Sequence, residues 1–340
     1  MTDYINGYYM KRERASALNR VKWFFYDLKV KIFGGGKSKP PRQHNKKAGQ
    51  SVFLFFFMLL PILQFLIFYV GVNVNSLKLA FQKYDGTKYV FAGVENFGAV
   101  LKAIFTEGGE LVRPLKNSAI QFAVGLLIGM PLQVMVAYVI FKEVPLSEFY
   151  KVMLFLPNII SSLVFVICVR MIVQKGFPII FNKPGMNLLS QLNSSSFYTV
   201  LIFGLWMNFA GGLIIYLSAM CGISKDVIEY GQLEDMSSFQ EFWHVVLPSI
   251  FPTIVTYIVV AIAGFFTNYG HFYSFFGGEG RGEKPFDTLG YYFFVKVVGD
   301  NVTLYDYPFA AAGGILFTIV VAPITLLTKH LLEKYGPSED

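Results

Sequence analysis

Six long apolar stretches constrain the fold of this 340-residue sequence more than any other feature. About 20 consecutive apolar residues are enough to cross the hydrocarbon core of a membrane as an α-helix. All six stretches reach that length, and none contains Asp or Glu. They lie near residues 52–73, 117–141, 152–173, 198–221, 247–269 and 308–328. The sequence therefore predicts an all-α polytopic membrane protein with six transmembrane helices.

The composition excludes an ordinary soluble domain and gives no support to an enzyme. Only 15% of the residues are charged and 54% are hydrophobic, whereas soluble domains carry about 25% charged residues. The two cysteines lie in or beside apolar stretches, and the four histidines fall on separate segments. We therefore expect no disulfide framework, no metal site and no catalytic group.

Basic residues predict the orientation in the membrane. Residues 1–50 contain 12 Lys and Arg against three acidic residues, and the positive-inside rule places such a segment in the cytoplasm. Six spans return the C-terminus to the same side. The loop 74–116 would then be external although it carries six Lys and Arg, so the prediction depends chiefly on the N-terminal tail.

The chain divides by composition into three parts. Residues 1–50 form a basic cytoplasmic tail, 51–332 the transmembrane domain, and 333–340 a short C-terminal tail. Aromatic and lysine residues alternate over 21–33, which suits a helix lying on an anionic membrane surface. The alternative is a tail that only determines topology. We expect no nucleic-acid binding, because this charge has no recognition fold around it.

A glycine-rich motif in the tail resembles the end of a phosphate-binding loop. It reads Gly-Gly-Gly-Lys-Ser over 34–38. The P-loop spacing requires a further glycine at position 31, where this sequence has Lys31, and no buried strand precedes the motif. We therefore expect no nucleotide site on this chain.

A charged segment over 224–248 separates the fourth and fifth apolar stretches. Asp226 and Ser238 are each followed three residues later by glutamate, the spacing of a capping box at the start of a helix. Apolar residues recur at helical spacing after each of them. The segment therefore predicts two short helices joined by a turn near 235–237.

This segment resembles the cytoplasmic EAA loop of ABC importer permease subunits, whose pattern is Glu-Ala-Ala, three residues, Gly-Ala and a later Leu-Pro. Glu229 matches the glutamate, Leu247-Pro248 matches the closing pair, and Asp235 stands where the family has glycine. Asp adopts the left-handed turn conformation more easily than most residues. The resemblance to maltose-type sugar permeases extends over about 51–332 and implies the type I ABC importer permease fold.

In that family the loop is a coupling helix that fits a groove on an ATPase subunit. The resemblance implies that Glu229 offers a carboxylate to the ATPase, while Phe239 and Phe242 act as apolar anchors. The alternative is an amphipathic pair of interfacial helices without a partner. The residues assigned to coupling are Glu229, Gly231, Glu234, Asp235, Ser237, Phe239, Phe242, Leu247 and Pro248.

Uncharged polar residues inside the spans are candidates for a translocation path, because each is costly in lipid unless it faces protein or water. Amides with nearby aromatic rings suit a polyhydroxylated solute, although asparagine also forms bonds between helices. Gln121, Gln133, Asn158, Ser161 and Ser162 are second-rank candidates. The residues assigned to the path are Asn208, Gly211, Phe265, Asn268 and Tyr269.

The resemblance implies a permease subunit of a bacterial ATP-driven importer for an oligosaccharide or related carbohydrate. The expected partners are a second permease, two ATP-binding subunits, an extracellular solute-binding protein and membrane lipid. ATP and magnesium would bind the ATPase and no cofactor would bind this chain. One alternative is an ion-coupled secondary transporter, which needs an intramembrane carboxylate or an unwound ion site. A non-transporting scaffold is the other.

Overall fold

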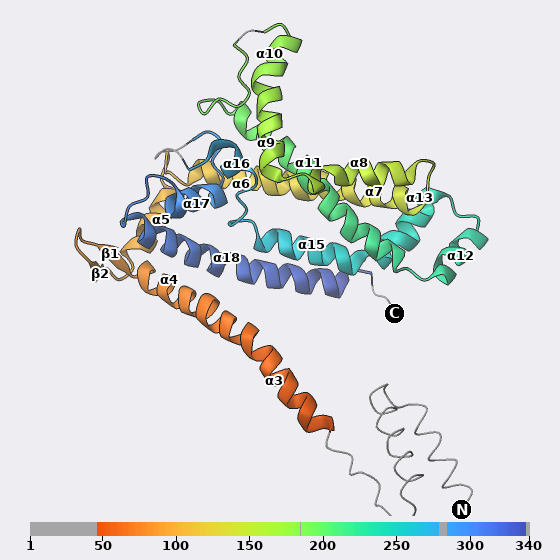
Figure 1. Cartoon of the computed structure of the whole chain (residues 1–340), viewed down its shortest axis with the longest axis horizontal. Helices are drawn as coiled ribbons and strands as arrows, with labels where there is room; N and C mark the ends of the chain where they lie inside the picture. The colour runs from red at the N-terminus through yellow and green to blue at the C-terminus, as the bar shows by residue number, and fades with distance from the viewer. Residues whose placement is uncertain (1–45, 184, 279–283, 338–340) are drawn as a thin grey trace, which may run out of the picture. The chain divides into compact units, whose positions relative to one another are not determined.

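The computed structural model describes residues 46–183, 185–278 and 284–337 (Figure 1). The amphipathic segment of the basic tail and the glycine-rich stretch 279–283 lie outside the described residues. The chain divides into two units, residues 1–69 and 70–340.

The described part of the first unit is one apolar helix. It comprises α3 (Lys46–Gln64) and the first residues of a π-helical turn, η1 (Phe65–Gly71). Helical backbone satisfies its own hydrogen bonds, as a membrane requires. The stretch Phe53–Ala80, which includes α4 (Val72–Ala80), is long and apolar enough to span a membrane. The first predicted span is therefore confirmed, and its helix begins before residue 51.

A small β-hairpin follows α4 and departs from the all-α prediction. Strands β1 (Gln82–Tyr84) and β2 (Tyr89–Phe91) pair antiparallel, with Gln82 opposite Phe91. The helix α5 (Glu95–Phe105) comes next, and its Asn96 donates hydrogen bonds to the carbonyls of Ala80 (2.8 Å) and Gln82 (2.7 Å). Asn96 thus fastens α5 to the end of α4.

The second and fourth spans agree with their predictions and pack against each other. The second runs through α6 (Val112–Val124), the π-helical turn η2 (Gly125–Gly129) and α7 (Met130–Phe141). The fourth is the single helix α11 (Ser195–Cys221). Contacts between α7 and α11 are extensive, and their facing residues form a core around Val134, Leu213 and Tyr216. This pair is the framework of the second unit.

The predicted third span, 152–173, is misplaced. Residues 147–159 form a separate helix, α8 (Ser147–Ile159), which ends before extended backbone at Ile160 and Ser161. The membrane-length helix is Ser162–Ile180, made of α9 (Ser162–Met171), the π-helical turn η3 (Ile172–Gly176) and α10 (Phe177–Ile180). Hydropathy did not reveal the break because both sides of it are apolar.

The fifth span is bent. Its first arm comprises α13 (Ser238–Glu241), the π-helical turn η4 (Phe242–Val246) and α14 (Leu247–Ser249), and its second arm is α15 (Phe251–Ala263). The arms differ in direction by 65° across Ile250. Within the described ranges there are therefore five straight membrane-length helices, or up to six when this pair counts as one span.

Three further helices complete the second unit. They are α16 (Phe272–Phe276), α17 (Leu289–Val298) and α18 (Asp306–Tyr335). The sixth predicted span is confirmed in α18, which contacts α4, α5 and α15. The loop before α17 is fastened to α6, because the Asn117 amide donates to the Asp287 carbonyl (2.8 Å) and Ser118 Oγ accepts from the Leu289 amide (2.9 Å).

Candidate functional site

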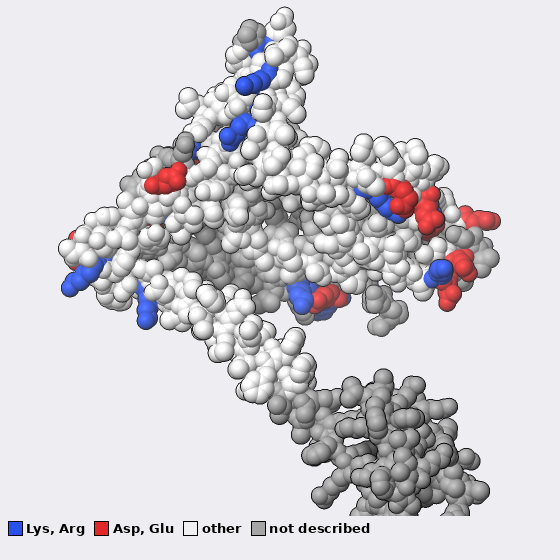
Figure 2. Space-filling model, in the orientation of Figure 1, with Lys and Arg blue, Asp and Glu red and all other residues white. Residues whose placement is uncertain are grey.

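The charged segment between the fourth and fifth spans forms two helices and a turn, as its sequence predicts. The first helix is α12 (Lys225–Leu233), and the second begins at α13 and continues through η4 into α14. Residues 234–237 make the turn. Acidic side chains gather at the end of the second unit that carries α12 (Figure 2). We call residues 225–249 the charged loop.

Asp235 has the backbone conformation that glycine favours. Its φ is +51°, in the left-handed region, and its side chain is exposed. Asp is among the few non-glycine residues that adopt this conformation at modest cost. The turn therefore forms with Asp235 in place of glycine.

The helix caps differ by one residue from the prediction. The residue before α13 is Ser237, whose side chain accepts from the Gln240 amide while the Gln240 side chain accepts from the Ser237 amide (3.0 Å). The predicted box of Ser238 and Glu241 is therefore wrong. Asp226 lies inside the first turn of α12, which begins at Lys225.

The two phenylalanines assigned to partner contact have opposite environments. Phe239 is 71% exposed, whereas Phe242 is 9% exposed and packs on the Tyr138 ring of α7, with 5.0 Å between ring centroids. Residues three apart are neighbours on a helix surface, so the difference comes from what packs against each ring and not from their spacing. The burial of Phe242 contradicts the expected anchor role and makes it part of the core under the charged loop.

The remaining residues assigned to coupling divide between surface and core. Glu229, Glu234 and Ser237 are exposed. Gly231 is buried, and a Cβ there would make an ordinary van der Waals contact with Val245 at 3.7 Å. Leu247 and Pro248 are half-buried and lie directly after the π-helical turn η4, at the start of α14.

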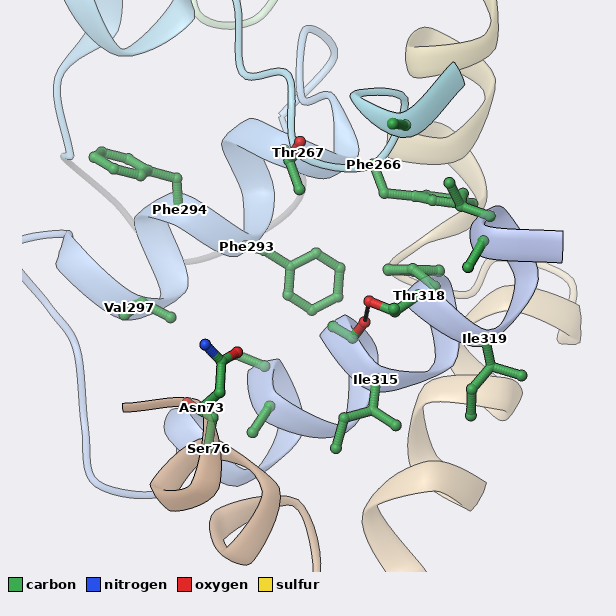
Figure 3. A pocket seen from close by; sticks show the side chains of 18 of the residues that line it. Asn73, Ser76, Phe266, Thr267, Phe293, Phe294, Val297, Ile315, Thr318 and Ile319 are labelled. Carbon is green, nitrogen blue, oxygen red and sulfur yellow. Dashed lines mark hydrogen bonds between the residues drawn. The ribbon is translucent and has the colours of Figure 1, made fainter. Parts of the chain in front are cut away.

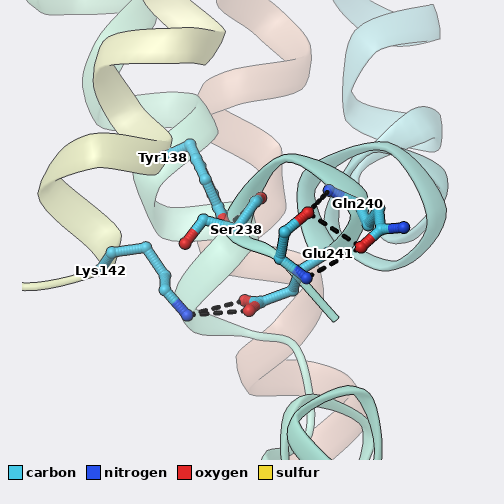
Figure 4. A network of polar contacts seen from close by, with 6 residues as sticks. Tyr138, Lys142, Ser238, Gln240 and Glu241 are labelled. Carbon is cyan, nitrogen blue, oxygen red and sulfur yellow. Dashed lines mark hydrogen bonds and ion pairs between the residues drawn. The ribbon is translucent and has the colours of Figure 1, made fainter. Parts of the chain in front are cut away.

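A buried ion pair in the charged loop was missed by the sequence analysis. Lys142 at the end of α7 contacts both carboxylate oxygens of Glu241, at 3.0 and 2.9 Å (Figure 4). The Tyr138 hydroxyl donates to the Ser238 carbonyl (2.8 Å) beside it. Lys142 and Glu241 are 99 positions apart in the sequence, so no local sequence pattern could have predicted that they pair.

A cavity of about 620 Å³ lies among the second, fourth and fifth spans. It brings together four of the five residues assigned to the path, namely Asn208, Gly211, Phe265 and Asn268. The second-rank candidates Gln121 and Gln133 line it as well, and so does His271. Desolvation by burial lowers the pKa of His271.

Hydrogen bonds within this cavity are mostly local. Asn208 donates to the Gly204 carbonyl one turn earlier (2.8 Å), and Asn268 accepts from the Gly270 amide (2.8 Å). Neither of these two hydrogen bonds joins two helices, so they do not support the alternative of interhelical bonding. Both side chains are exposed, and each amide has further hydrogen-bonding capacity.

Gln133 is a buried polar group of this cavity. It is 3% exposed, and its Nε2 donates across to the Asn208 carbonyl on α11 (3.3 Å). Among the residues that the structure describes, its Oε1 has no hydrogen-bond partner. Its amide lies against Gly212, where a Cβ would come within 2.2 Å of Oε1. Gly212 therefore makes room for an acceptor that a hydroxyl can satisfy.

Tyr269 lies outside the 620 Å³ cavity. It lines a different pocket of about 1120 Å³ among α4, α15, α17 and α18, and stacks on Phe294 with 4.8 Å between centroids. Most side chains in that pocket are apolar, including Phe266, Phe293 and Ile315 (Figure 3). The assignment of Tyr269 to the same path as Asn208 is therefore not supported by their positions.

In the described part of the chain, no group of three or more His, Cys, Asp or Glu residues could hold a metal ion. Cys168 and Cys221 are free thiols.

Comparison with known proteins identifies the family. Residues 121–337 match the model of the binding-protein-dependent transport system inner membrane component. This match covers more than half of the sequence, and the chain belongs to that family. It is therefore a transport component and not an enzyme.

Curated relatives match over most of their length. The multiple sugar-binding transport system permease protein MsmF of Streptococcus mutans is 20% identical, over 82% of this chain and 94% of its own. The arabinooligosaccharides transport system permease protein AraP of Bacillus subtilis is 21% identical, over 85% and 90%. The polygalacturonan/rhamnogalacturonan transport system permease protein YteP of the same species is 24% identical, over 83% and 88%.

A solved structure supports the same fold. A chain of a bacterial ABC transporter involved in the import of the acidic polysaccharide alginate aligns with a TM-score of 0.64 and 20% identity, covering 85% of this chain and 98% of that one. The chain is thus a multi-pass membrane protein with the type I ABC importer permease fold, and it acts as a permease of a binding-protein-dependent importer.

Proposed function

We propose that this permease translocates an oligosaccharide or a related carbohydrate. The observation that carries the proposal is the 620 Å³ cavity, which is lined by four amide side chains, those of Gln121, Gln133, Asn208 and Asn268. Amides both donate and accept hydrogen bonds, and the neighbouring Phe265 supplies an aromatic ring for the apolar face of a sugar. The relatives named for sugars and oligosaccharides support this class of solute.

Asn208, Gly211, Phe265 and Asn268 form the solute path of this proposal. The exposed side chains of Asn208 and Asn268 accept and donate hydrogen bonds to sugar hydroxyls, while Gln133 Oε1 accepts one at the buried side of the cavity. Gly211 leaves open space beside the path, since a Cβ there would have no neighbour within 4 Å.

The charged loop is the proposed contact with an ATP-binding subunit. Glu229, Glu234, Asp235 and Phe239 are exposed on it. These three acidic side chains and one aromatic side chain suit a groove on the ATP-binding subunit that is basic and contains an apolar pocket. ATP and magnesium would bind the two ATP-binding subunits, and their closure would move this loop as a rigid element.

A second permease subunit and an extracellular solute-binding protein complete the proposed assembly. A second solved alginate transporter structure includes a periplasmic protein bound to alginate pentasaccharide. We place the chain in the bacterial inner membrane with both termini in the cytoplasm.

Co-purification and uptake test the proposal together. The detergent-solubilised wild-type chain should carry an ATPase and a second permease, and Glu229→Ala combined with Asp235→Lys should lose the ATPase. Asn208→Ala combined with Asn268→Ala should keep both partners and reduce uptake of labelled oligosaccharides. A wild-type chain that purifies alone, or drives uptake from an ion gradient without ATP, would contradict the proposal.

A further inference from the structure

The ion pair between Lys142 and Glu241 joins two functional regions of the molecule. Glu241 belongs to α13 in the charged loop, and Lys142 follows the last residue of α7. Both carboxylate oxygens face the same ammonium group, at 3.0 and 2.9 Å (Figure 4). This bidentate geometry restricts the position of α13 relative to α7.

Burial distinguishes this pair from the other ion pairs in the described ranges. The Glu241 side chain is 4% exposed and that of Lys142 is 28% exposed. By contrast, Lys83–Glu95 has exposures of 53% and 64%, and Glu148 of the Lys151 pair is 84% exposed. An exposed pair contributes little, whereas a buried carboxylate that loses its partner is left with an uncompensated charge.

Two further contacts reinforce the same junction. The Tyr138 hydroxyl, one helical turn before Lys142, donates to the Ser238 carbonyl at 2.8 Å. The Tyr138 ring also packs on Phe242. Three interactions of different kinds therefore connect the last turn of α7 to the start of the fifth span. We call these residues, Tyr138, Lys142, Ser238, Glu241 and Phe242, the latch.

The latch leads along α7 to the cavity. Gln133 lies nine positions before Lys142 on the same helix, which corresponds to about 14 Å of helix length. Its Nε2 contacts the α11 backbone at Asn208, and its Oε1 lies against Gly212. A displacement of α7 along or about its axis would therefore move Gln133 within the cavity.

We infer that the Lys142–Glu241 pair makes the charged loop and α7 move as one body, so that displacement of the loop reaches Gln133 through α7 as well as through the fifth span. This inference rests on the proposed function. Lys142 and Glu241 are positioning residues here, because neither faces the solute cavity nor the exposed surface of α12. Without the pair, the loop can move while α7 stays in place.

The test uses the complete importer, purified with its ATP-binding subunits and reconstituted in vesicles. Three variants are compared with wild type: Glu241→Gln, Lys142→Met, and the exchange Lys142→Glu with Glu241→Lys. Glu148→Gln is the matched control, since it removes a carboxylate from an exposed lysine pair on α8. Each sample is measured for ATPase co-purification, ATP hydrolysis and uptake of labelled oligosaccharide.

The ratio of uptake to ATP hydrolysed distinguishes positioning from folding. Misfolding lowers uptake and hydrolysis together, because fewer complexes are present. Loss of the latch should keep the ATPase bound and lower the ratio about tenfold, within the usual range of coupling between two sites. The exchanged pair should recover much of the wild-type ratio, and Glu148→Gln should not change it.

Three results would contradict either the proposed function or the inference about the latch. If wild type shows no ATPase partner and no ATP-dependent uptake, the proposed function fails. If wild type transports normally and both single variants keep the wild-type ratio, the latch inference fails while the proposed function stands. A lowered ratio that the exchange does not restore would also overturn it, because complementary charge would then not be the cause.

Discussion

The polar groups named in the charged loop are paired with one another, whereas those named in the cavity keep unused hydrogen-bonding capacity. In the loop, Ser237 and Gln240 cap each other, and Glu241 is paired with Lys142. In the cavity, Gln133 Oε1 is buried without a partner and the two asparagines are exposed. A loop that satisfies its own backbone and buried charge is stiff enough to transmit a displacement. A cavity that leaves hydrogen-bonding capacity unused can accept a ligand.

Glu241→Ala would remove the buried ion pair of the charged loop and should have the largest effect on stability. Removing one partner of a buried ion pair typically costs 3–5 kcal/mol, and the partial exposure of Lys142 places our expectation at about 3 kcal/mol. Thermal unfolding of the detergent-solubilised protein measures the effect. The exposed control Glu148→Ala should change stability by less than about 1 kcal/mol. Equal effects of the two substitutions would show that the loop gains nothing from burial of Glu241.

Gly212→Ala would test whether the Gln133 acceptor in the cavity contributes to solute binding. The added methyl group would come within 2.2 Å of Gln133 Oε1, so the amide must move. We expect about 1–2 kcal/mol of destabilisation from overpacking, together with weaker uptake because the acceptor is displaced. Gly314→Ala on α18 is the matched control, since its Cβ would also meet nothing within 4 Å and Gly314 does not line the 620 Å³ cavity. Unchanged uptake in Gly212→Ala would show that Gln133 does not contribute to solute binding.

Asp235→Gly sharpens the picture of the turn in the loop. Glycine adopts φ near +51° without a Cβ penalty, so the variant should be more stable by about 0.5 kcal/mol. Asp235→Ala should be less stable than wild type, because alanine lacks the local side-chain hydrogen bonding that helps Asp. Denaturant or thermal unfolding measures both. A destabilised glycine variant would mean that the Asp235 side chain holds the turn by a contact of its own.

The smallest expected effect is a pH dependence far from the loop. Glu110 accepts from the Tyr292 hydroxyl (2.5 Å) and lies 3.5 Å from Lys296; the hydrogen bond first, and Lys296 next, lower the pKa of Glu110 below its ordinary value of 4.5. Its contribution to stability is therefore present above pH 4.5 and is lost as pH falls through the lowered pKa. Thermal unfolding of wild type and Glu110→Gln should differ at pH 6 and converge at acidic pH. A difference independent of pH would contradict the assignment.

The sequence was sufficient for most of the spans and for the position of the charged loop, but it misplaced the third span. Apolar length identifies a membrane helix because lipid leaves few other backbone structures available. The same pattern could not locate the break at Ile160 or the bend at Ile250, since apolar residues continue on both sides. It also placed Phe239 and Phe242 together, although only the packing of Tyr138 distinguishes which one is buried.

The cavity was predicted in part for a physical reason. Polar residues in an apolar span must face protein or water, and this criterion found Asn208 and Asn268. It could not separate Tyr269 from them, because a tyrosine suits several environments and only the fold shows which pocket it enters. No local sequence pattern identifies the residues that join distant segments, which are Lys142 with Glu241 and Gln133 with Gly212.

The bend at Ile250 has a mechanical consequence. The arm that holds the latch and the arm that lines the cavity differ in direction by 65°. A displacement directed along the first arm is therefore not directed along the second. Most of it acts perpendicular to the axis of α15, at the beginning of that helix. The response expected of α15 is a tilt, which would displace Phe265 and Asn268 just beyond its other end.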